Sequence, residues 1–350
     1  MTGPKGAVEL APTDRAVALS PGWLSAILQA QYPGARVSQV SVLFEFTTLA
    51  TKMRLGLEYD ANPLGAPASV FMKAFLDGDA VRGWIGVPEA QFFSELAPSL
   101  DLRMPRAVYA AVDDSIPHGM VILEDMEAQG VTFLGALSPY SVDQADATLG
   151  ELAKLHAQSW DSSRLTDPWL QPVVEKFTGY KSTEELQSLL DGERGSPLPD
   201  DVCRAARLQS AVAAVFAITA EDRRCLVHGD AHAGNLYLTA EGEPGICDWQ
   251  IVSRCHWSFD VAYHTATALT PEDRRASEQD LLRAYLDRLR AAGAEVPAWS
   301  DAWDAYRRAL VYGYNLWAVT TTVDPRITNE FVRRQGLAVA EHDSLGMLGV

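Results

Sequence analysis

The stretch LVHGDAHAGNLYL, at residues 226–238, places several polar side chains between two apolar ends. The residues after Asn235 are typical of a strand, a turn at 241–245 and a second strand. Such a hairpin would bring Asn235 beside Asp248, because paired residues lie roughly 5 Å apart across a ladder. An amide oxygen and a carboxylate at that separation are ligands suited to Mg²⁺. Asp230 would then be free to accept a proton or to orient a hydroxyl group.

Each of these three residues also has an ordinary structural explanation. Asp230 could cap a turn, Asn235 could bond the loop backbone, and Asp248 could pair with a distant arginine. Asp248, however, lies between the apolar Ile246-Cys247 and Trp249, which indicates burial. Burying several carboxylates together is unfavourable unless a cation compensates them, so a bound metal explains the set better.

The strands and helices expected around these side chains indicate an α+β protein. Up to about residue 125 the pattern is mainly that of strands, at 37–46, 52–60, 69–76, 107–114 and 119–126, with helices at 21–31 and near 88–97. The later pattern is mainly helical, at 144–160, 278–292, 301–317 and 325–342, with strands only near 226–249. We therefore expect two domains, a β-rich one at 1–125 and a mainly helical one at 126–350.

The amino-acid composition argues against some classes of binding partner. The net charge of −17, from 29 basic and 46 acidic residues, argues against nucleic acid and against an anionic membrane surface. The sequence has no apolar run of about 18 residues and no signal-peptide pattern at its start. The four cysteines form no CxxC pair, and with the nearby histidines they fit no common zinc spacing. A cytoplasmic protein with free thiols is predicted, and its oligomeric state is not.

HGDAHAGN, at 228–235, resembles the HGDxxxxN signature of the aminoglycoside phosphotransferase and choline kinase superfamily. ICDWQ, at 246–250, is similar to the metal-binding segment of these small-molecule kinases. The longer run from ICDWQ to TPEDRR is similar to the ecdysteroid kinase-like branch and its bacterial relatives. The resemblance implies a bilobal protein-kinase-like fold, with a small β-rich N-terminal lobe and a larger, mainly helical C-terminal lobe.

The resemblance also implies ATP and Mg²⁺ as cofactors. Asp230 matches the catalytic aspartate, which positions the acceptor hydroxyl and takes its proton. Asn235 and Asp248 match the Mg²⁺ ligands of the family. His228 and Asp260 match residues that support the catalytic loop.

A phosphate-binding lysine is expected in SVFMKAFL, where Lys73 lies between apolar residues on a strand. An exposed edge lysine is the alternative. Glu89 falls within the apolar stripe of the helix near 88–97, together with Phe92, Phe93 and Leu96. An inward carboxylate needs a partner, and Lys73 is the obvious one. The family pattern, a glutamate three residues before an aromatic pair, also favours Glu89.

GMVILEDM, at 119–126, resembles the linker between the lobes of these kinases. The resemblance implies that the backbone from Glu124 to Met126 contacts the adenine of the nucleotide. An ordinary strand end is the alternative.

One segment departs from the kinase pattern. LFEFTTLATKM, between the first two strands, contains no glycine, although Thr47, Thr48 and Thr51 could offer hydroxyls and amides to phosphate. Close approach of the backbone is harder without glycine. This departure keeps open a nucleotide-binding pseudokinase as an alternative to an enzyme.

The expected reaction is transfer of the γ-phosphoryl group of ATP to a hydroxyl of a small organic acceptor. A protein kinase is disfavoured, because Gly229 stands where protein kinases carry the arginine of HRD and no APE segment follows. Residues 167–180 and 312–317 are candidate acceptor contacts, with core packing as the alternative for the aromatic side chains of 312–317. A fairly apolar alcohol and an amine-bearing acceptor both remain open.

Overall fold

The computed structural model describes residues 10–171, 180–220, 222 and 224–350. The chain divides into two compact units. The first unit comprises the described parts of Met1–Leu100, Met104–Val131 and Asp248–Gln250, and the second comprises those of Asp101–Arg103, Thr132–Cys247 and Ile251–Val350. The segment Asp248–Gln250 thus belongs to the first unit although it comes late in the chain. The domain boundary expected between residues 125 and 126 stays a prediction.

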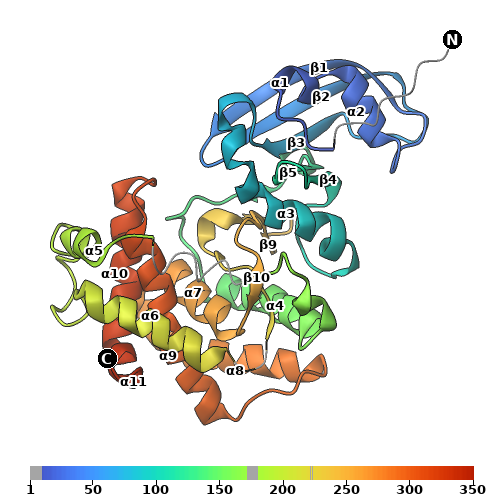
Figure 1. Ribbon diagram of the computed structural model, residues 1–350. Coiled ribbons are helices and arrows are strands. Elements are labelled where there is room, and N and C mark those ends of the chain that lie inside the picture. The colour runs from blue at the N-terminus through green and yellow to red at the C-terminus, as the bar shows by residue number, and fades with distance from the viewer. Residues whose placement is uncertain (1–9, 172–179, 221, 223) are drawn as a thin grey trace. The chain divides into compact units, whose positions relative to one another are not determined.

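The first unit is built on an antiparallel sheet (Figure 1). Within its described residues the sheet has five strands in the order β1-β2-β3-β5-β4, and every neighbouring pair is antiparallel. The strands are β1 (Arg36–Thr47), β2 (Thr51–Ala61), β3 (Ser69–Ala74), β4 (Ala107–Asp113) and β5 (His118–Glu124). The strands predicted from the sequence are confirmed, with ends that differ by a few residues.

Alternation of apolar residues forms this sheet and its core. In β2 the side chains of Met53, Leu55 and Leu57 are buried while their neighbours are partly exposed, which is the period of a strand with one face covered. Helix α2 (Pro21–Leu28) belongs to the same hydrophobic core. It begins where the Ser20 side chain accepts a hydrogen bond from the Trp23 amide.

The first unit has further helical elements. They are α1 (Arg15–Ala18), α3 (Val87–Gln91), the π-helix η2 (Phe92–Leu96) and the 3₁₀ helices η1 (Asp77–Gly86), η3 (Ala97–Ser99) and η4 (Glu127–Gln129). The sequence predicts one helix near 88–97, whereas the structure has one α-helical turn that continues as a π-helix. π-helical turns are rare and often lie at functional sites.

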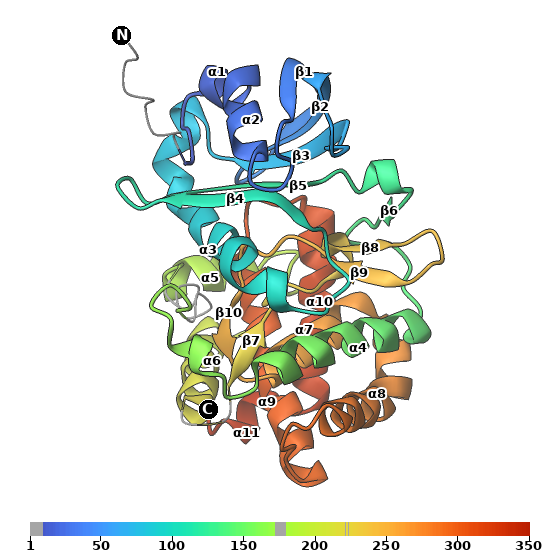
Figure 2. The same cartoon turned by 90° about the vertical axis from the view of Figure 1, so that its right-hand side faces the viewer.

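The second unit is mainly helical (Figure 2). Its helices are α4 (Val142–Ser159), α5 (Thr183–Leu190), α6 (Ala205–Thr219), α7 (Ser258–Ala268), α8 (Pro271–Ala291), α9 (Trp299–Val319), α10 (Pro325–Glu341) and α11 (Ser344–Met347), with 3₁₀ turns η5 (Ser163–Thr166) and η7 (Ala233–Asn235). Helix α7 contacts α9, and α4 lies beside α8. Every residue of α7 is buried, so this helix lies inside the unit. Helices α4, α8, α9 and α10 are those predicted from the sequence, whereas α5, α6 and α7 were not predicted.

Short strands complete the second unit. They are β6 (Thr132–Phe133), β7 (Cys225–Val227), β8 (Leu236–Leu238), β9 (Pro244–Ile246) and β10 (Ser253–Cys255). The hairpin predicted after Asn235 is confirmed, because β8 pairs with β9 and the Cys247 amide donates to the Asn235 carbonyl oxygen at 2.9 Å. Strands β6 and β10 were not predicted. The α+β class is confirmed, with an antiparallel sheet in the N-terminal part and helices in the C-terminal part.

Among the helices of the described ranges, none combines the length and the apolar character needed to cross a membrane.

Candidate active site

A buried cluster of charges lies in the first unit. The Lys73 Nζ is 2.7 Å from a Glu89 carboxylate oxygen and 2.6 Å from Asp248 Oδ1. Lys73 comes from β3, Glu89 from α3 and Asp248 from the late segment, so three separate parts of the sequence meet here. The ion pair predicted between Lys73 and Glu89 is present.

The cluster contains a fourth charged residue, Lys52, which was not predicted from the sequence. The Lys52 Nζ, at the start of β2, lies 3.1 Å from Asp248 Oδ2. Asp248 therefore holds one lysine on each of its two carboxylate oxygens.

These neighbours set the protonation states of the cluster. Burial alone would lower the pKa of Lys73, but the charges of Asp248 and Glu89 offset this and raise its pKa above the ordinary value. Burial alone would raise the pKa of Asp248, but Lys73 and Lys52 hold that pKa far below its usual range. Burial, with the charge of Asp248, raises the pKa of Glu89. Lys73 is therefore a cation, and Asp248 an anion, at neutral pH.

The segment that carries Asp248 is fixed by its neighbour Trp249. The Trp249 amide donates to Glu89 Oε1 at 3.1 Å, and the indole stacks on Phe92 with ring centres 4.2 Å apart. Asp248 itself has a φ of 62°, in the left-handed region, which aspartate tolerates better than most residues. Glu89 thus binds both Lys73 and the backbone beside Asp248.

The end of β5 holds the residues predicted to contact adenine. The Glu124 amide donates to the Arg106 carbonyl at 2.9 Å, and the Met126 carbonyl accepts from the Gln129 amide at 3.0 Å. Between them, the buried Asp125 accepts from Arg54 Nε at 2.6 Å. These contacts fix the backbone at 124–126, and its contact with a nucleotide stays a prediction.

The second unit holds the loop of residues 228–235, here called the HGD loop. The carboxylate of Asp260, on α7, accepts hydrogen bonds from the backbone amides of His228 and Gly229, both at 2.7 Å. His156 contacts the same carboxylate at 3.2 Å. Burial raises the pKa of Asp260, but His156 and these bonds more than offset it, so the pKa is lowered. These contacts support the structural role predicted for Asp260.

His228 connects the HGD loop to the end of the hairpin. Its Nε2 lies 3.0 Å from the Cys247 carbonyl oxygen, and its Nδ1 accepts from the Asp230 amide at 3.2 Å. Both ring nitrogens are therefore used within the protein. This supports a structural role for His228 rather than proton transfer.

Asp230 and Asn235 are brought together within the loop. The Asn235 side-chain nitrogen donates to the Asp230 carbonyl oxygen at 2.9 Å and to its Oδ2 at 3.1 Å. Asp230 and Asn235 lie in the second unit, and Asp248 lies in the first, so their convergence on one cation stays a proposal.

A tyrosine that the sequence did not predict contacts Asp230. The Tyr263 hydroxyl, on α7, donates to Asp230 Oδ1 at 2.5 Å and accepts from Trp317 Nε1 at 2.9 Å. Burial, with the charge of Asp230, raises the pKa of Tyr263 well above its ordinary value, so the hydroxyl stays a donor. The signal available in the sequence was a buried-looking tyrosine three residues after Asp260.

The candidate acceptor contacts have mixed outcomes. Tyr312, Tyr314 and Trp317 are buried, which supports the core-packing alternative. Tyr312 also donates to the Gly229 carbonyl oxygen at 2.6 Å, so it supports the HGD loop from α9. Of the segment 167–180, residues 172–179 lie outside the described residues.

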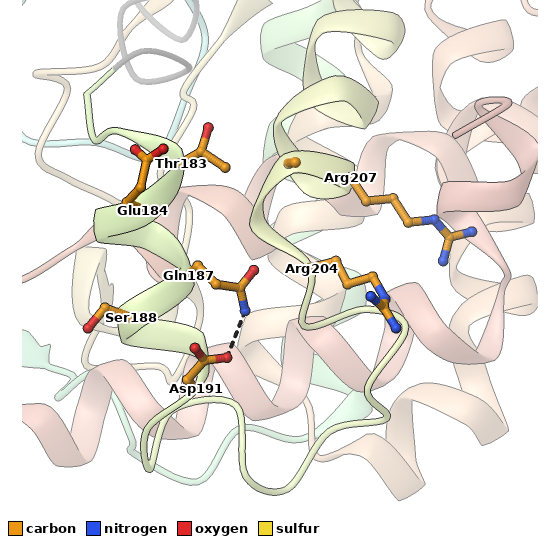
Figure 3. A pocket seen from close by; sticks show the side chains of 8 residues that line it. Thr183, Glu184, Gln187, Ser188, Asp191, Arg204 and Arg207 are labelled. Carbon is orange, nitrogen blue, oxygen red and sulfur yellow. Dashed lines mark hydrogen bonds between the residues drawn. The ribbon is translucent and has the colours of Figure 1, made fainter.

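An open hollow of about 710 Å³ lies between α5 and the start of α6 (Figure 3). Its lining mixes Glu184 and Asp191 with Arg204 and Arg207, and Gln187 donates to Asp191 at 2.8 Å. None of the predicted site residues lines it. The lining of the hollow is therefore distinct from the predicted catalytic and binding residues.

Residues 87–296 match the sequence profile of the ecdysteroid kinase-like family. No curated protein sequence matches the chain.

Solved structures with a similar fold include small-molecule kinases. A choline kinase from Cryptosporidium parvum Iowa II has a TM-score of 0.55 at 12% identity, over 94% of this chain and 98% of that one. An ethanolamine kinase from Plasmodium vivax has a TM-score of 0.50 at 10% identity, over 97% and 91%. The GDP complex of wild-type aminoglycoside 2'-phosphotransferase-IIIa has a TM-score of 0.51 at 12% identity, over 92% and 99%. At these identities the likeness shows a shared, protein-kinase-like fold.

Proposed function

Because the chain belongs to the ecdysteroid kinase-like family, we propose that it transfers the γ-phosphoryl group of ATP to a hydroxyl of a small organic molecule. The observation that carries the proposal is the cluster in which Lys73 Nζ lies 2.7 Å from Glu89 and 2.6 Å from Asp248. In protein kinases a strand lysine paired with a helix glutamate binds the phosphates and an aspartate binds the metal, and the cluster of Lys73, Glu89 and Asp248 has the same parts.

ATP and Mg²⁺ fit the residues present. Asp248 is an ionised carboxylate, and the side-chain nitrogen of Asn235 is engaged by Asp230, which leaves the amide oxygen as the atom it can offer to a cation. These two residues would hold Mg²⁺, Lys73 the phosphates, and the backbone of Glu124 to Met126 the adenine. When bound, Mg²⁺ neutralises charge on the phosphates. The GDP bound to the aminoglycoside 2'-phosphotransferase-IIIa supports a nucleotide as ligand.

The chain's own groups then perform the chemistry at the acceptor. The acceptor oxygen attacks the γ-phosphorus, and the bond from that phosphorus to the β–γ bridging oxygen breaks, which releases ADP. The hydroxyl proton passes to the Asp230 carboxylate. Tyr263 and Asn235 hold this carboxylate in position through their hydrogen bonds. The choline kinase, the ethanolamine kinase and the aminoglycoside phosphotransferase of similar fold favour a small hydroxylated acceptor, such as an amino alcohol or an aminoglycoside.

A non-catalytic nucleotide-binding protein is the second candidate. The turn between β1 and β2 favours it, because Thr48 donates to the Ala50 carbonyl at 3.1 Å in a tight turn that contains no glycine. The presence of Lys73, Glu89 and Asp248 in one cluster argues for the enzyme.

The decisive experiment is a phosphotransfer screen against amino alcohols, aminoglycosides and steroid alcohols, with products measured by mass spectrometry. The Asp230→Asn variant should lower turnover by about 10²–10⁴-fold and leave ATP binding nearly unchanged, because only the proton acceptor is lost. Asp280→Asn, at an exposed aspartate of α8, is the matched control. Unchanged turnover in Asp230→Asn would remove the proposed base, and Mg²⁺-dependent ATP binding without any product would favour the second candidate.

The proposed metal ligand has its own test. Asp248→Ala should weaken ATP binding in Mg²⁺ and abolish most of its dependence on Mg²⁺ concentration, as measured by isothermal titration calorimetry. A normal Mg²⁺ dependence in this variant would contradict the assignment.

A further inference from the structure

We propose that Lys52 is a second phosphate-binding cation, which replaces the contacts that a glycine-rich loop makes in other kinases. This inference rests on the proposed function, since it concerns the same nucleotide.

Lys52 and Lys73 are direct neighbours across strands β2 and β3. Like charges in such positions repel each other and destabilise a sheet. Here the repulsion is offset by Asp248, which accepts from Lys73 on Oδ1 and from Lys52 on Oδ2. A pair of lysines that needs an anion between them is suited to a polyanionic ligand.

Of the two lysines, Lys52 can change its partner more easily. Its side chain is 16% exposed, against 5% for Lys73. Lys73 is also held by Glu89, whereas Lys52 contacts Asp248 and lies over the Phe46 ring at 5.6 Å. The Lys52 ammonium therefore has fewer partners to exchange than Lys73, and a phosphate oxygen could replace the Asp248 oxygen as its acceptor.

The turn before Lys52 explains why a side chain is needed. Thr47 pairs with Thr51 across the hairpin, and the buried Ala50 uses its carbonyl oxygen within the turn. Each residue of this turn carries a β-carbon, which keeps the backbone from close approach to a phosphate. A lysine at its base has the length to reach the phosphate instead, with a charge-assisted hydrogen bond.

The charges of the cluster indicate why Lys52 would move from Asp248 to a phosphate when the nucleotide and the metal bind. The two lysines and the carboxylates of Glu89 and Asp248 are together close to neutral. When Asp248 serves as a metal ligand, its charge is shared with the metal, and the lysines lose part of their compensation. The phosphates restore the balance if Lys52 Nζ turns from Asp248 to a phosphate oxygen. The contribution of Lys52 to affinity should therefore increase with the number of phosphates.

The test measures dissociation constants for adenosine, AMP, ADP and ATP in Mg²⁺ by isothermal titration calorimetry. In Lys52→Met, affinity for ATP should fall about tenfold, which is the size expected for loss of one charge-assisted hydrogen bond. The loss should be smaller for ADP and smaller again for AMP, and adenosine should bind as before. Lys52→Arg should retain most of the affinity for ATP. Arg36→Met, at an exposed position at the opposite end of β1, controls for loss of one positive charge from the same sheet.

Thermal unfolding without nucleotide checks that each variant is folded. If Lys52→Met does not fold, Lys52→Gln takes its place in the binding measurements. If the wild-type protein binds Mg²⁺-ATP and Lys52→Met binds it equally well, the inference is wrong while the proposed function stands. An equal loss for adenosine and ATP, or the same loss in Arg36→Met, also overturns it. Absence of any nucleotide binding by the wild-type protein would overturn the proposed function as well.

Discussion

The residue that the proposed chemistry depends on most, Asp230, has a carboxylate whose two oxygens are held by different neighbours. Tyr263 donates to Oδ1 at 2.5 Å, and Asn235 donates to Oδ2 at 3.1 Å. The Tyr263 oxygen accepts in turn from the Trp317 indole. A chain of hydrogen bonds that begins in the core therefore fixes the orientation of the proposed base, and it stabilises the ionised carboxylate.

Tyr263→Phe should test this positioning role. Loss of the hydroxyl should lower kcat about tenfold and leave KM nearly unchanged, because a hydrogen bond to a charged group contributes roughly 1.5–3 kcal/mol. The acidic limb of the kcat–pH profile should also move to higher pH, since the ionised base loses a donor.

The matched control for this prediction is Tyr314→Phe, which removes a hydroxyl that donates to the Val202 carbonyl. It lowers stability without touching Asp230, so it should leave the pH profile in place. A profile that is the same in Tyr263→Phe and wild type would contradict the positioning role.

The sequence alone identifies some of these residues and misses others for a physical reason. Asp230 and Asn235 belong to one motif, and Lys73 and Glu89 are polar residues within apolar patterns. Lys52 pairs with a residue 196 positions away, and a partner at such a separation leaves no local pattern. The position of Tyr263 depends likewise on tertiary packing.

Among the helices and strands, hydrophobic periodicity predicts only those that have one buried face and one exposed face. Strand β2 alternates between buried and partly exposed residues, and it was predicted. Helix α7 is buried on all sides, so it has no amphipathic period, and it was missed. The turn of π-helix in η2 was missed because it differs from an α-helix in hydrogen bonding rather than in composition.

The position of α3, which carries Glu89, depends on a close contact between two glycines. A β-carbon added at Gly119, in β5, would collide with the backbone of Gly86 and Val87, where α3 begins. The sheet and the helix start approach closely because neither glycine has a side chain. The sequence contains both glycines, but it does not indicate that they meet.

Gly119→Ala should therefore displace α3. We expect a loss of about 1–3 kcal/mol in the free energy of unfolding, as for an overpacked core, together with weaker ATP binding because Glu89 is moved relative to Lys73. Urea unfolding and calorimetry measure the two effects. Gly78→Ala, where an added β-carbon meets no atom within 4 Å, is the control. Equal behaviour of the two variants would show that the close contact is unimportant.

The stability of the whole protein and the position of the HGD loop depend on the same buried groups. Asp260 and His264, both on α7, bind the backbone of the HGD loop; His264 Nδ1 lies 2.7 Å from the Ala231 carbonyl oxygen. The protein carries a net charge of −17, yet these groups are isolated from the charged surface by burial. Acid should therefore destabilise the folded protein by protonating these buried groups as well as the carboxylates of the surface.

Burial lowers the pKa of His264 to about 4, against an ordinary value of about 6.5. The unfolded chain thus binds a proton at a higher pH than the folded protein does. The stability contribution of the neutral imidazole is complete above about pH 6.5 and is lost as the pH falls towards 4, by about 3 kcal/mol over the window. The lowered pKa of Asp260 has the same sign, and its contribution is lost below about pH 4, as the carboxylate becomes protonated.

The free energy of urea unfolding, measured from pH 8 to pH 4, should accordingly fall most steeply between pH 6.5 and 4. His264→Gln keeps a side-chain donor for the Ala231 carbonyl but has no proton to gain, so the variant should show a flatter profile across that window. A wild-type slope in His264→Gln would mean that the imidazole is protonated in the folded protein. The link between acid and the HGD loop would then have to depend on carboxylates alone.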